Sequence, residues 1–575
     1  MRRSLFGLAG LAVLGLGWLI VTGLLAVQAA HHAERDLSIA RTMLSEGDTS
    51  GLQSITADLA KQTHRAHSLT TGPVWWVGSA LPYVGRPVRV ARGIAASGDI
   101  VGRRIVPAIS SLSHELDPKT LHPTGTTIEI APIEAARPTL DTAYADAVDA
   151  LATIQALPRH TWLSSVDNVR GSSADELSQV TSYLRTADRL AHILPAMAGS
   201  AAPQRYFVGL QNEAELRGTG GVPGVFAILV AERGTIRFTH FESDSALHGG
   251  TVPTGLNLGT DFTAYASGSN PTSVFVNSDL SPNFPYAARI WAAMWQKVSG
   301  EHVDGAIALD PTALSYLLAV TGPATLPDGS QVSSANVVAL TEKDEYATFA
   351  DTAKRKAYLV ELTKAVDGQL LSGAGSPTDL AKAFGRAGGE NRLQVWSADA
   401  AVERVLVSSG FAGAIPQTAR PFSALVVNNV AAGKLDYYLH RHISVQRTGC
   451  GATREVQVTI QLDNDAPTGL PAYVTTRLDS EAATAKPGDN RSRVDYVATR
   501  GAQLLGATVD GRPALVQTLR LLGHPVYRYD LELPRGESRT IVLRLIEPGG
   551  QLPPQKWTQP GVSALDSTYY DQRCG

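Results

Sequence analysis

Cysteine is almost absent from this sequence of 575 residues, which contains only Cys450 and Cys574. This count excludes a zinc site made of cysteines, and the pair lacks the close C-x-x-C spacing that lowers a thiol pKa in redox proteins. Both cysteines fall in the last quarter of the chain. We therefore expect them to form a disulfide in an exported protein, with a redox couple as the disfavoured alternative.

Blocks of one charge sign are also missing. The 50 basic and 53 acidic residues give a formal net charge of -3, and no basic cluster is present that would neutralise a nucleic-acid backbone. The P-loop pattern G-x-x-x-x-G-K-[ST], the metalloprotease pattern H-E-x-x-H and the hydrolase pattern G-x-S-x-G do not occur either. The sequence therefore predicts no nucleic-acid partner and none of these three enzyme classes.

A long uncharged run is present at one place, the N-terminus. Residues 4–30 contain no charge, and 27 residues are enough for a helix to cross a hydrocarbon core of about 30 Å. Arg2 and Arg3 precede this run, so the positive-inside bias predicts a cytoplasmic N-terminus with the bulk of the chain extracytoplasmic. The sequence thus predicts a single-pass membrane protein. A cleaved signal peptide is the alternative, with Val27 and Ala29 near the cleavage site.

Residue patterns divide the rest of the chain into three predicted parts. Residues 31–200 are alanine-rich with apolar residues three and four positions apart, which predicts a helical stalk. Residues 201–430 alternate strand and helix patterns, as in an α/β sheet with helices on its faces. Residues 431–575 contain closely spaced strand patterns, which favour an immunoglobulin-like β-sandwich. With residues 1–30 as a transmembrane anchor, these parts make up the expected fold class.

Three local signals predict particular turns and caps. The stretch "GVFAILVAERGTIRF" predicts a hairpin that turns at residues 232–234. In "VDGAIALDPTALSYLLAVTGP", Asp310 is the expected N-cap of a helix that begins at Pro311. In "RLQVWSADAAVERVLVSSG", Ser397 is the expected N-cap and Gly410 the C-terminal stop.

The most polar part of the α/β region is "QNEAELRGTGG", which follows the apolar strand pattern of residues 206–210. An extended backbone would place Glu213, Glu215 and Arg217 on one face, and the glycines would let backbone amides approach a ligand. A guanidinium beside free amides suits phosphate, and neighbouring carboxylates suit a divalent cation such as Mg²⁺. The alternative is an internal Glu–Arg ion pair that braces a glycine turn.

Two further polar segments follow the predicted hairpin. They are "FESDSALHG", which contains Asp244, and "NSDLSPNFPYAARIWAAMW", which begins just ahead of a predicted helix. Asn and Asp also favour turns and caps, so a structural role is the alternative for each. The predicted ligand-binding residues are Asn212, Arg217, Thr219, Gly220, Gly221, Asn277 and Asn283, the predicted metal ligands are Glu213, Glu215 and Asp244, and Arg217 and Asp279 are the predicted catalytic pair.

At these residues the chain resembles a known family. The stretches "YFVGLQNEAELRGTGGVPG", "SPNFPYAA", "VDGAIALDPTALSYLLAVTGP" and "NNVAAGKLDYYL" are similar to the bacterial family known as domain of unknown function 4012. A weaker likeness is to the LytR-CpsA-Psr family of membrane-anchored phosphotransferases. That resemblance implies that Arg217 grips phosphate, that Glu213 or Glu215 holds magnesium, and that Asn277 and Asp279 complete the rim. This chain lacks the "S-I-P-R-D" segment of that family, which puts catalysis in doubt.

Two functions remain open at this point. The resemblance to the phosphotransferases implies a cell-envelope protein that binds or transfers phosphate-linked glycans from a polyprenyl-pyrophosphate carrier. Such an enzyme would use metal-assisted phosphoryl transfer. The alternative is a non-catalytic envelope scaffold or adhesion protein in which the glycine loop is merely braced.

Overall fold

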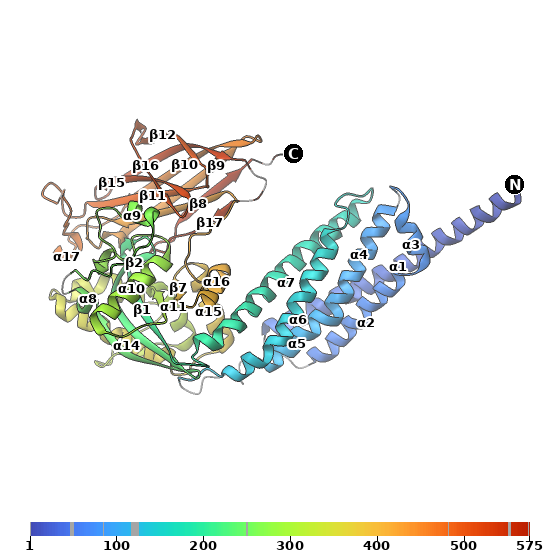
Figure 1. Ribbon diagram of the computed structural model, residues 1–575, viewed down its shortest axis with the longest axis horizontal. Coiled ribbons are helices and arrows are strands. Elements are labelled where there is room, and N and C mark those ends of the chain that lie inside the picture. The colour runs from blue at the N-terminus through green and yellow to red at the C-terminus, as the bar shows by residue number, and fades with distance from the viewer. Residues whose placement is uncertain are drawn as a thin grey trace. The chain divides into compact units, whose positions relative to one another are not determined.

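The computed structural model describes residues 2–46, 51–83, 85–116, 126–248, 251–480, 482–549, 552, 554–572 and 574. The chain divides into two compact units, one made of residues 1–122 with 129–196 and the other of residues 123–128 with 197–575. Within the described residues the first unit is helical, and every strand that belongs to a sheet lies in the second (Figure 1).

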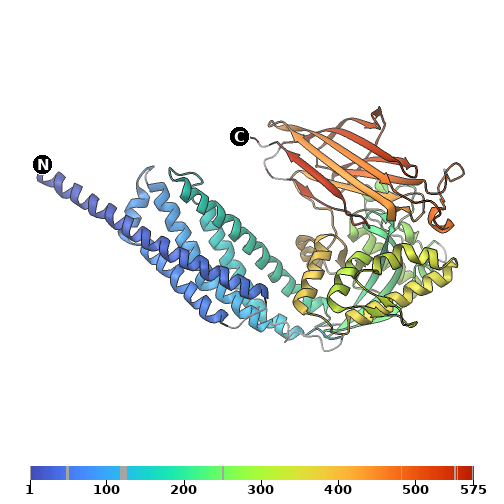
Figure 2. The ribbon, with the colours of Figure 1, turned by 180° about the vertical axis from the view of Figure 1, so that it is seen from behind.

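The first unit consists of long helices that pack along one another (Figure 1 and Figure 2). Alanines at the contact faces allow close approach of the backbones, because Ala136, Ala143, Ala147 and Ala150 are all fully buried. The elements are α1 (Arg2–Glu46), α2 (Leu52–Thr70), α3 (Pro73–Ala80), α4 (Gly85–Ile100), the π-helical turn η1 (Val101–Ile105), α5 (Val106–Glu115), α6 (Ile130–Gln155) and α7 (Ser164–Met197).

The predicted membrane anchor is contradicted. Across the described residues, no helix is both long enough and apolar enough to cross a membrane. The prediction that residues 4–30 form a transmembrane helix is therefore wrong, and the predicted single-pass membrane location with a cytoplasmic N-terminus is wrong with it. The apolar run belongs to the longer helix α1, which packs against α2 and α3. Ala33 of α1 and Leu59 of α2 belong to one hydrophobic cluster, and within the apolar run Thr22 Oγ1 accepts a hydrogen bond from Trp75 Nε1 at 2.8 Å.

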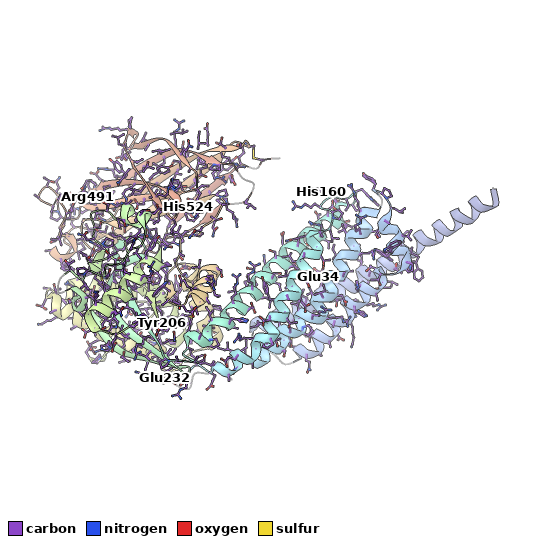
Figure 3. The ribbon with its side chains drawn as sticks, viewed as in Figure 1. Glu34, His160, Tyr206, Glu232, Arg491 and His524 are labelled. Carbon is purple, nitrogen blue, oxygen red and sulfur yellow. A yellow bond between two sulfur atoms is a disulfide. The ribbon has the colours of Figure 1, made fainter. Side chains whose placement is uncertain are left out.

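A five-stranded mixed sheet begins the second unit. Its strand order is β3-β2-β1-β4-β7, with β1 antiparallel to β2 and parallel to β4. Tyr206 lies near the start of β1 and Glu232 at the end of β2 (Figure 3). The strands are β1 (Gln204–Arg217), β2 (Gly220–Glu232), β3 (Thr235–Ser243), β4 (Gly305–Leu309) and β7 (Leu393–Ser397), and β5 (Ala324–Thr325) pairs with β6 (Gln331–Val332) apart from them.

Helices cover both faces of this sheet. Because successive β1 residues point to opposite sides, β1 packs against helices on both faces. Phe207 packs with Trp291 of α10, whereas Leu210 packs with the cluster that contains Leu314 of α11 and Leu362 of α14. The helical elements are α8 (Ser245–His248), α9 (Thr260–Tyr265), η2 (Phe275–Asn277), α10 (Phe284–Ser299), α11 (Pro311–Thr321), α12 (Val337–Ala339), η3 (Leu340–Asp344), α13 (Glu345–Thr348), α14 (Thr352–Leu370), α15 (Pro377–Gly389) and α16 (Ala400–Ser409).

The last part of the chain forms two sheets that face each other (Figure 2). One has the order β13-β12-β16-β10-β9-β18 and the other β14-β15-β11-β8-β17, and alternating apolar residues of both fill the space between them. The elements are β8 (Phe422–Asn429), η4 (Leu435–Tyr438), β9 (Leu439–Thr448), β10 (Thr453–Asn464), α17 (Ala472–Thr475), β11 (Asn490–Ala498), β12 (Gln503–Val509), β13 (Arg512–Pro513), β14 (Gln517–Leu521), β15 (His524–Leu533), β16 (Ser538–Pro548), β17 (Gln555–Lys556) and β18 (Asp566–Asp571).

The sandwich and the α/β sheet share one hydrophobic cluster. This cluster contains Phe207 of β1 and Trp291 of α10 together with Phe422 and Val426 of β8. Strand β8 precedes residue 431, the position at which the sequence predicted the sandwich to begin. The two parts of the second unit are therefore joined by a common core rather than by a linker.

The local predictions are mostly confirmed. Arg233 and Gly234 adopt positive φ angles of 48° and 82° at the turn between β2 and β3, and the Asp310 carboxylate accepts the Ala313 amide at 2.7 Å as an N-cap. The N-cap prediction for Ser397 is wrong, because Ser397 is the last residue of β7. The cap is Asp399, which accepts the amides of both Ala401 and Val402.

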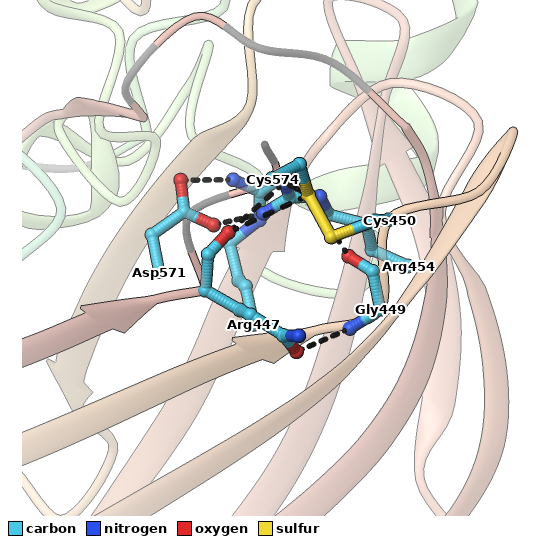
Figure 4. Close-up of a disulfide and its surroundings, with 7 residues drawn as sticks. Arg447, Gly449, Cys450, Arg454, Asp571 and Cys574 are labelled. Carbon is cyan, nitrogen blue, oxygen red and sulfur yellow. Dashed lines mark hydrogen bonds and ion pairs between the residues drawn. A yellow bond between two sulfur atoms is a disulfide. The ribbon is translucent and has the colours of Figure 1, made fainter.

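The predicted disulfide between Cys450 and Cys574 is confirmed (Figure 4). Cys450 lies between β9 and β10, while Cys574 follows β18, which pairs in parallel with β9. Asp571 forms ion pairs with Arg447 and Arg454 beside the disulfide. The C-terminal segment is thereby held against the sandwich by backbone pairing, by charge and by a covalent bond.

Candidate functional site

The polar segment that follows residue 210 continues the strand instead of forming a turn. Strand β1 extends to Arg217, with irregular register against β2 at Leu210–Gln211 and again between Asn212 and Leu216. These bulges re-aim the side chains, and the chain turns only at residues 218–219. The strand therefore carries its charged residues deep into the second unit.

Arg217 does not face an open crevice. Its side chain is 5% exposed, and all three guanidinium nitrogens donate to protein acceptors. Nε donates to the Val276 carbonyl at 3.1 Å, Nη1 to the carbonyls of Leu216 and Asn429 at 3.1 and 3.0 Å, and Nη2 to Glu215 Oε1 at 2.5 Å. Since these acceptors come from η2, β8 and β1, the guanidinium joins three segments that are distant in sequence.

Glu215 lies between two basic groups. One carboxylate oxygen pairs with Arg217, and the other pairs with the ammonium of Lys434, which is also buried. Burial favours the neutral form, but Lys434 and Arg217 outweigh it and hold the pKa of Glu215 below its usual value. Next to this group, Asp436 accepts the Leu216 amide at 2.8 Å. Glu215 is therefore a charged bridge between β1 and the start of the sandwich.

Glu213 occupies a second buried cluster. Arg392 Nη1 lies 3.1 Å from Glu213 Oε1 and 2.9 Å from Asp310 Oδ2. A third acid, Glu342, accepts the Glu213 amide at 2.7 Å. Burial and the neighbouring Asp310 raise the pKa of Glu213 to about 8, against the opposing effect of Arg392. The cluster thus carries more carboxyl groups than basic groups and retains protons near neutral pH.

Asp279 is fully buried and lies under the turn that follows β1. Its Oδ2 accepts hydrogen bonds from Gln211 and Thr219 at 3.2 and 3.4 Å, while its Oδ1 has no hydrogen-bond partner within the described part of the chain. Burial raises the pKa of Asp279 to about 7, although Arg217 opposes the shift. The predicted catalytic pair is therefore close in space but sealed from solvent.

The other predicted ligand-binding residues also serve the protein itself. Asn212 Nδ2 donates to Tyr346 Oη at 2.8 Å, and Asn277 Nδ2 donates to the Ser269 carbonyl oxygen at 2.7 Å. Asn283 Oδ1 accepts the backbone amide of Ile415 at 3.0 Å. These contacts fix the loops around β1.

The three predicted metal ligands are not brought together. Glu213 pairs with Arg392, Glu215 with Arg217 and Lys434, and Asp244 with Lys356 at 2.6 Å. A basic side chain thus occupies the place where a cation would bind each carboxylate, so the residues do not fit Mg²⁺ in this arrangement. The Mg²⁺ site stays a prediction without structural support.

The glycines of the turn pack against the protein backbone. A Cβ atom on Gly218 would lie 2.3 Å from the Leu280 carbonyl oxygen, and one on Gly221 would lie 2.1 Å from the Asn212 carbonyl oxygen. A Cβ on Gly220 would meet Gln211 Oε1 at 3.1 Å. Glycine is therefore needed at these positions, because a side chain would prevent the close packing of β1, β2 and the loop at residues 280–281.

Sequence reasoning missed the basic partners of this site, Lys434 and Arg392, as well as Asp436 and Glu342. A signal for two of them was present, because Lys434 and Asp436 lie within the stretch "AGKLDYYL". Their pairing with β1 depends on contacts across more than 200 positions, which no local pattern reveals.

A pocket of about 90 Å³ lies beside this network, lined in part by Glu342, Tyr346, Lys434 and Pro471. Its volume is well below the 300–1,000 Å³, roughly, that ligand pockets occupy. Burial and the nearby Glu213 raise the pKa of Glu342, which lines the pocket, well above its usual value. The pocket has room for a few water molecules rather than for a glycan chain.

Comparisons with known proteins add a family but no activity. No curated protein matches the chain. A solved structure of a candidate nutrient binding protein from Legionella pneumophila is similar over 22% of this chain and 44% of its own length, at 8% identity and a TM-score of 0.15, which is too low to carry an argument. The resemblance to the LytR-CpsA-Psr family stays a prediction. Residues 201–346 match the family model described as "Protein of unknown function (DUF4012)", which confirms the predicted resemblance to that family for this part of the chain.

Proposed function

We propose that this protein is a non-catalytic scaffold in which charged residues of β1 lock the α/β sheet to the β-sandwich. The observation that carries the proposal is the sealed Arg217, whose guanidinium joins β1 to η2 and β8. The Glu215–Lys434 pair makes a second link, and Gln559 adds a third by donating to the Arg217 carbonyl at 2.6 Å. Such a network stabilises one arrangement of the two parts of the second unit.

The transferase alternative has less support. A pyrophosphate group would need donors that point into an accessible cleft, and here it would have to displace protein acceptors from Arg217 inside the fold. Glycan phosphotransfer stays a prediction, because no observation of the structure favours it.

Rigidity of this kind suits a protein that holds its shape outside the reducing interior of a cell. The Cys450–Cys574 disulfide supports folding in an oxidising compartment. A scaffold or adhesion role needs a surface held in fixed geometry rather than a catalytic cleft, and the buried ion pairs and the disulfide both serve that need.

The test compares Arg217→Ala with Arg233→Ala. Arg217 is buried, whereas Arg233 lies at the exposed turn between β2 and β3 with an 82% exposed side chain. Removing one partner of a buried pair costs about 3–5 kcal/mol, whereas an exposed pair contributes about 0–1 kcal/mol. We expect a large loss of unfolding free energy for Arg217→Ala, little change for Arg233→Ala, and no binding of inorganic pyrophosphate, with or without Mg²⁺, by the wild type.

The opposite result would favour the transferase. It consists of wild-type protein that binds pyrophosphate, together with an Arg217→Ala protein that is as stable as the wild type but no longer binds. If Arg217→Ala does not fold, Arg217→Lys provides the comparison. Lysine keeps the positive charge but lacks the planar guanidinium group that donates to the carbonyls of Val276, Leu216 and Asn429.

A further inference from the structure

A cluster of potential metal ligands lies in the helical unit, on helices α6 and α7. Asp188 and His192 are four positions apart on α7 and therefore lie on one face of that helix, and Asp141 of α6 faces them. Each residue offers one ligand atom, and the three atoms lie within 4.8 Å of one another. Core packing holds this arrangement, because the adjacent residues Leu140 and Ala191 are buried in one hydrophobic cluster.

The imidazole of His192 is oriented by the backbone. Its Nδ1 lies 2.8 Å from the Asp188 carbonyl oxygen, and a carbonyl only accepts, so Nδ1 carries the proton of this bond. In the neutral ring Nε2 then carries a lone pair, and it lies 3.6 Å from Asp141 Oδ1. An imidazole whose other nitrogen is anchored to a backbone carbonyl is the usual arrangement of a metal-binding histidine.

Both carboxyl groups lie next to the imidazole of His192, at distances of 3.6 Å that are too long for a hydrogen bond. Asp188 Oδ1 is buried and has no hydrogen-bond partner among the described residues, although it lies 3.6 Å from His192 Nδ1. Asp141 brings a second carboxylate oxygen to the same place, so two like charges meet there. A cation among the three ligand atoms would relieve this repulsion and satisfy the buried oxygen.

We propose that Asp141, Asp188 and His192 bind a divalent transition-metal ion of the Zn²⁺ class. One imidazole nitrogen with two carboxylate oxygens suits Zn²⁺ better than Mg²⁺ or Ca²⁺, which prefer oxygen ligands alone. Three protein ligands leave a fourth position for water. The Asp141 side chain is 55% exposed, so an ion can enter from solvent. The bound ion would clamp α6 to α7, and this inference is independent of the proposed scaffold function.

The experiment is a calorimetric titration of the metal-free full chain with Zn²⁺. We expect the wild type to bind at one site, and we expect Asp188→Asn and His192→Gln each to weaken that binding at least tenfold. The matched control is His64→Gln, because His64 lies 3.3 Å from Asp99 in an Asp–His pair that has no third ligand within the described residues. This variant should bind Zn²⁺ as the wild type does.

Two results would overturn the proposal. One is the absence of Zn²⁺ binding by the wild type, which would mean that His192 only contacts the two aspartates within the fold. The other is binding that survives in both Asp188→Asn and His192→Gln, which would mean adventitious binding by exposed histidines. If either variant is misfolded by circular dichroism, the spectrum of Co²⁺ with the wild type decides. We expect the intense d–d absorption of a four-coordinate site, which Zn²⁺ abolishes, whereas the weak absorption of hydrated Co²⁺ would overturn the proposal.

Discussion

The ammonium of Lys434 binds the carboxylate of Glu215 although 219 positions separate the two residues in the chain. Both side chains are buried, so each charge depends on the other for compensation. This pair links strand β1 of the α/β sheet to the segment between β8 and β9.

Replacing Lys434 by methionine should destabilise the protein by about 3–5 kcal/mol, because Glu215 would keep one basic partner for two buried oxygens. The matched control is Lys382→Met, since Lys382 forms an exposed pair with Asp379 at 3.0 Å. That change should cost no more than about 0.5 kcal/mol. Urea unfolding of both variants measures the difference. Similar losses of unfolding free energy would show that the buried pair contributes no more to stability than the exposed pair.

The turn after β1 should tolerate no side chain at position 218. In Gly218→Ala the new Cβ would lie 2.3 Å from the Leu280 carbonyl oxygen, so the backbone must shift at a cost of about 1–3 kcal/mol or more. In Gly224→Ala, by contrast, no atom of the described residues would lie within 4 Å of the new Cβ. Melting temperatures should fall for the first variant and stay near the wild-type value for the second. Equal melting temperatures would contradict the tight packing of this turn.

Glu345 should make stability depend on pH. Burial raises its pKa to about 8, against the effects of Tyr346, Arg355 and Lys434, and neither carboxyl oxygen has a hydrogen-bond partner among the described residues. Below about pH 4.5 the group is protonated in both the folded and the unfolded protein. Between about pH 4.5 and 8 only the unfolded chain releases the proton, so the stability falls by about 1.4 kcal/mol per pH unit for this group.

Glu345→Gln removes that titration, and the unfolding free energy of the variant should fall less steeply than that of the wild type between about pH 4.5 and 8. The control is Glu361→Gln, because the Glu361 side chain is 47% exposed and pairs with Lys364 at the surface. Its stability curve should run parallel to the wild-type curve. If the Glu345→Gln curve is parallel as well, Glu345 ionises at its ordinary pKa in the folded protein.

The sequence alone determined the features that depend on neighbouring residues. The hairpin turn at Arg233–Gly234 and the Asp310 cap follow from local backbone and hydrogen-bond chemistry, and the likeness of residues 201–346 to a known family follows from motifs that are contiguous in the chain. The disulfide was also predictable, because a chain with only two cysteines has one possible intramolecular pairing.

Only the tertiary structure decided what the polar residues of β1 do. Composition around Arg217 fits a phosphate site and an internal ion pair equally well, and the choice depends on Asn429 and Lys434, which arrive from beyond residue 420. The continuation of the apolar N-terminal run into the longer helix α1, which contacts α2 and α3, was likewise visible only in the structure. Burial and long-range pairing set the dielectric environment of each charge, and neither can be read from spacing along the chain.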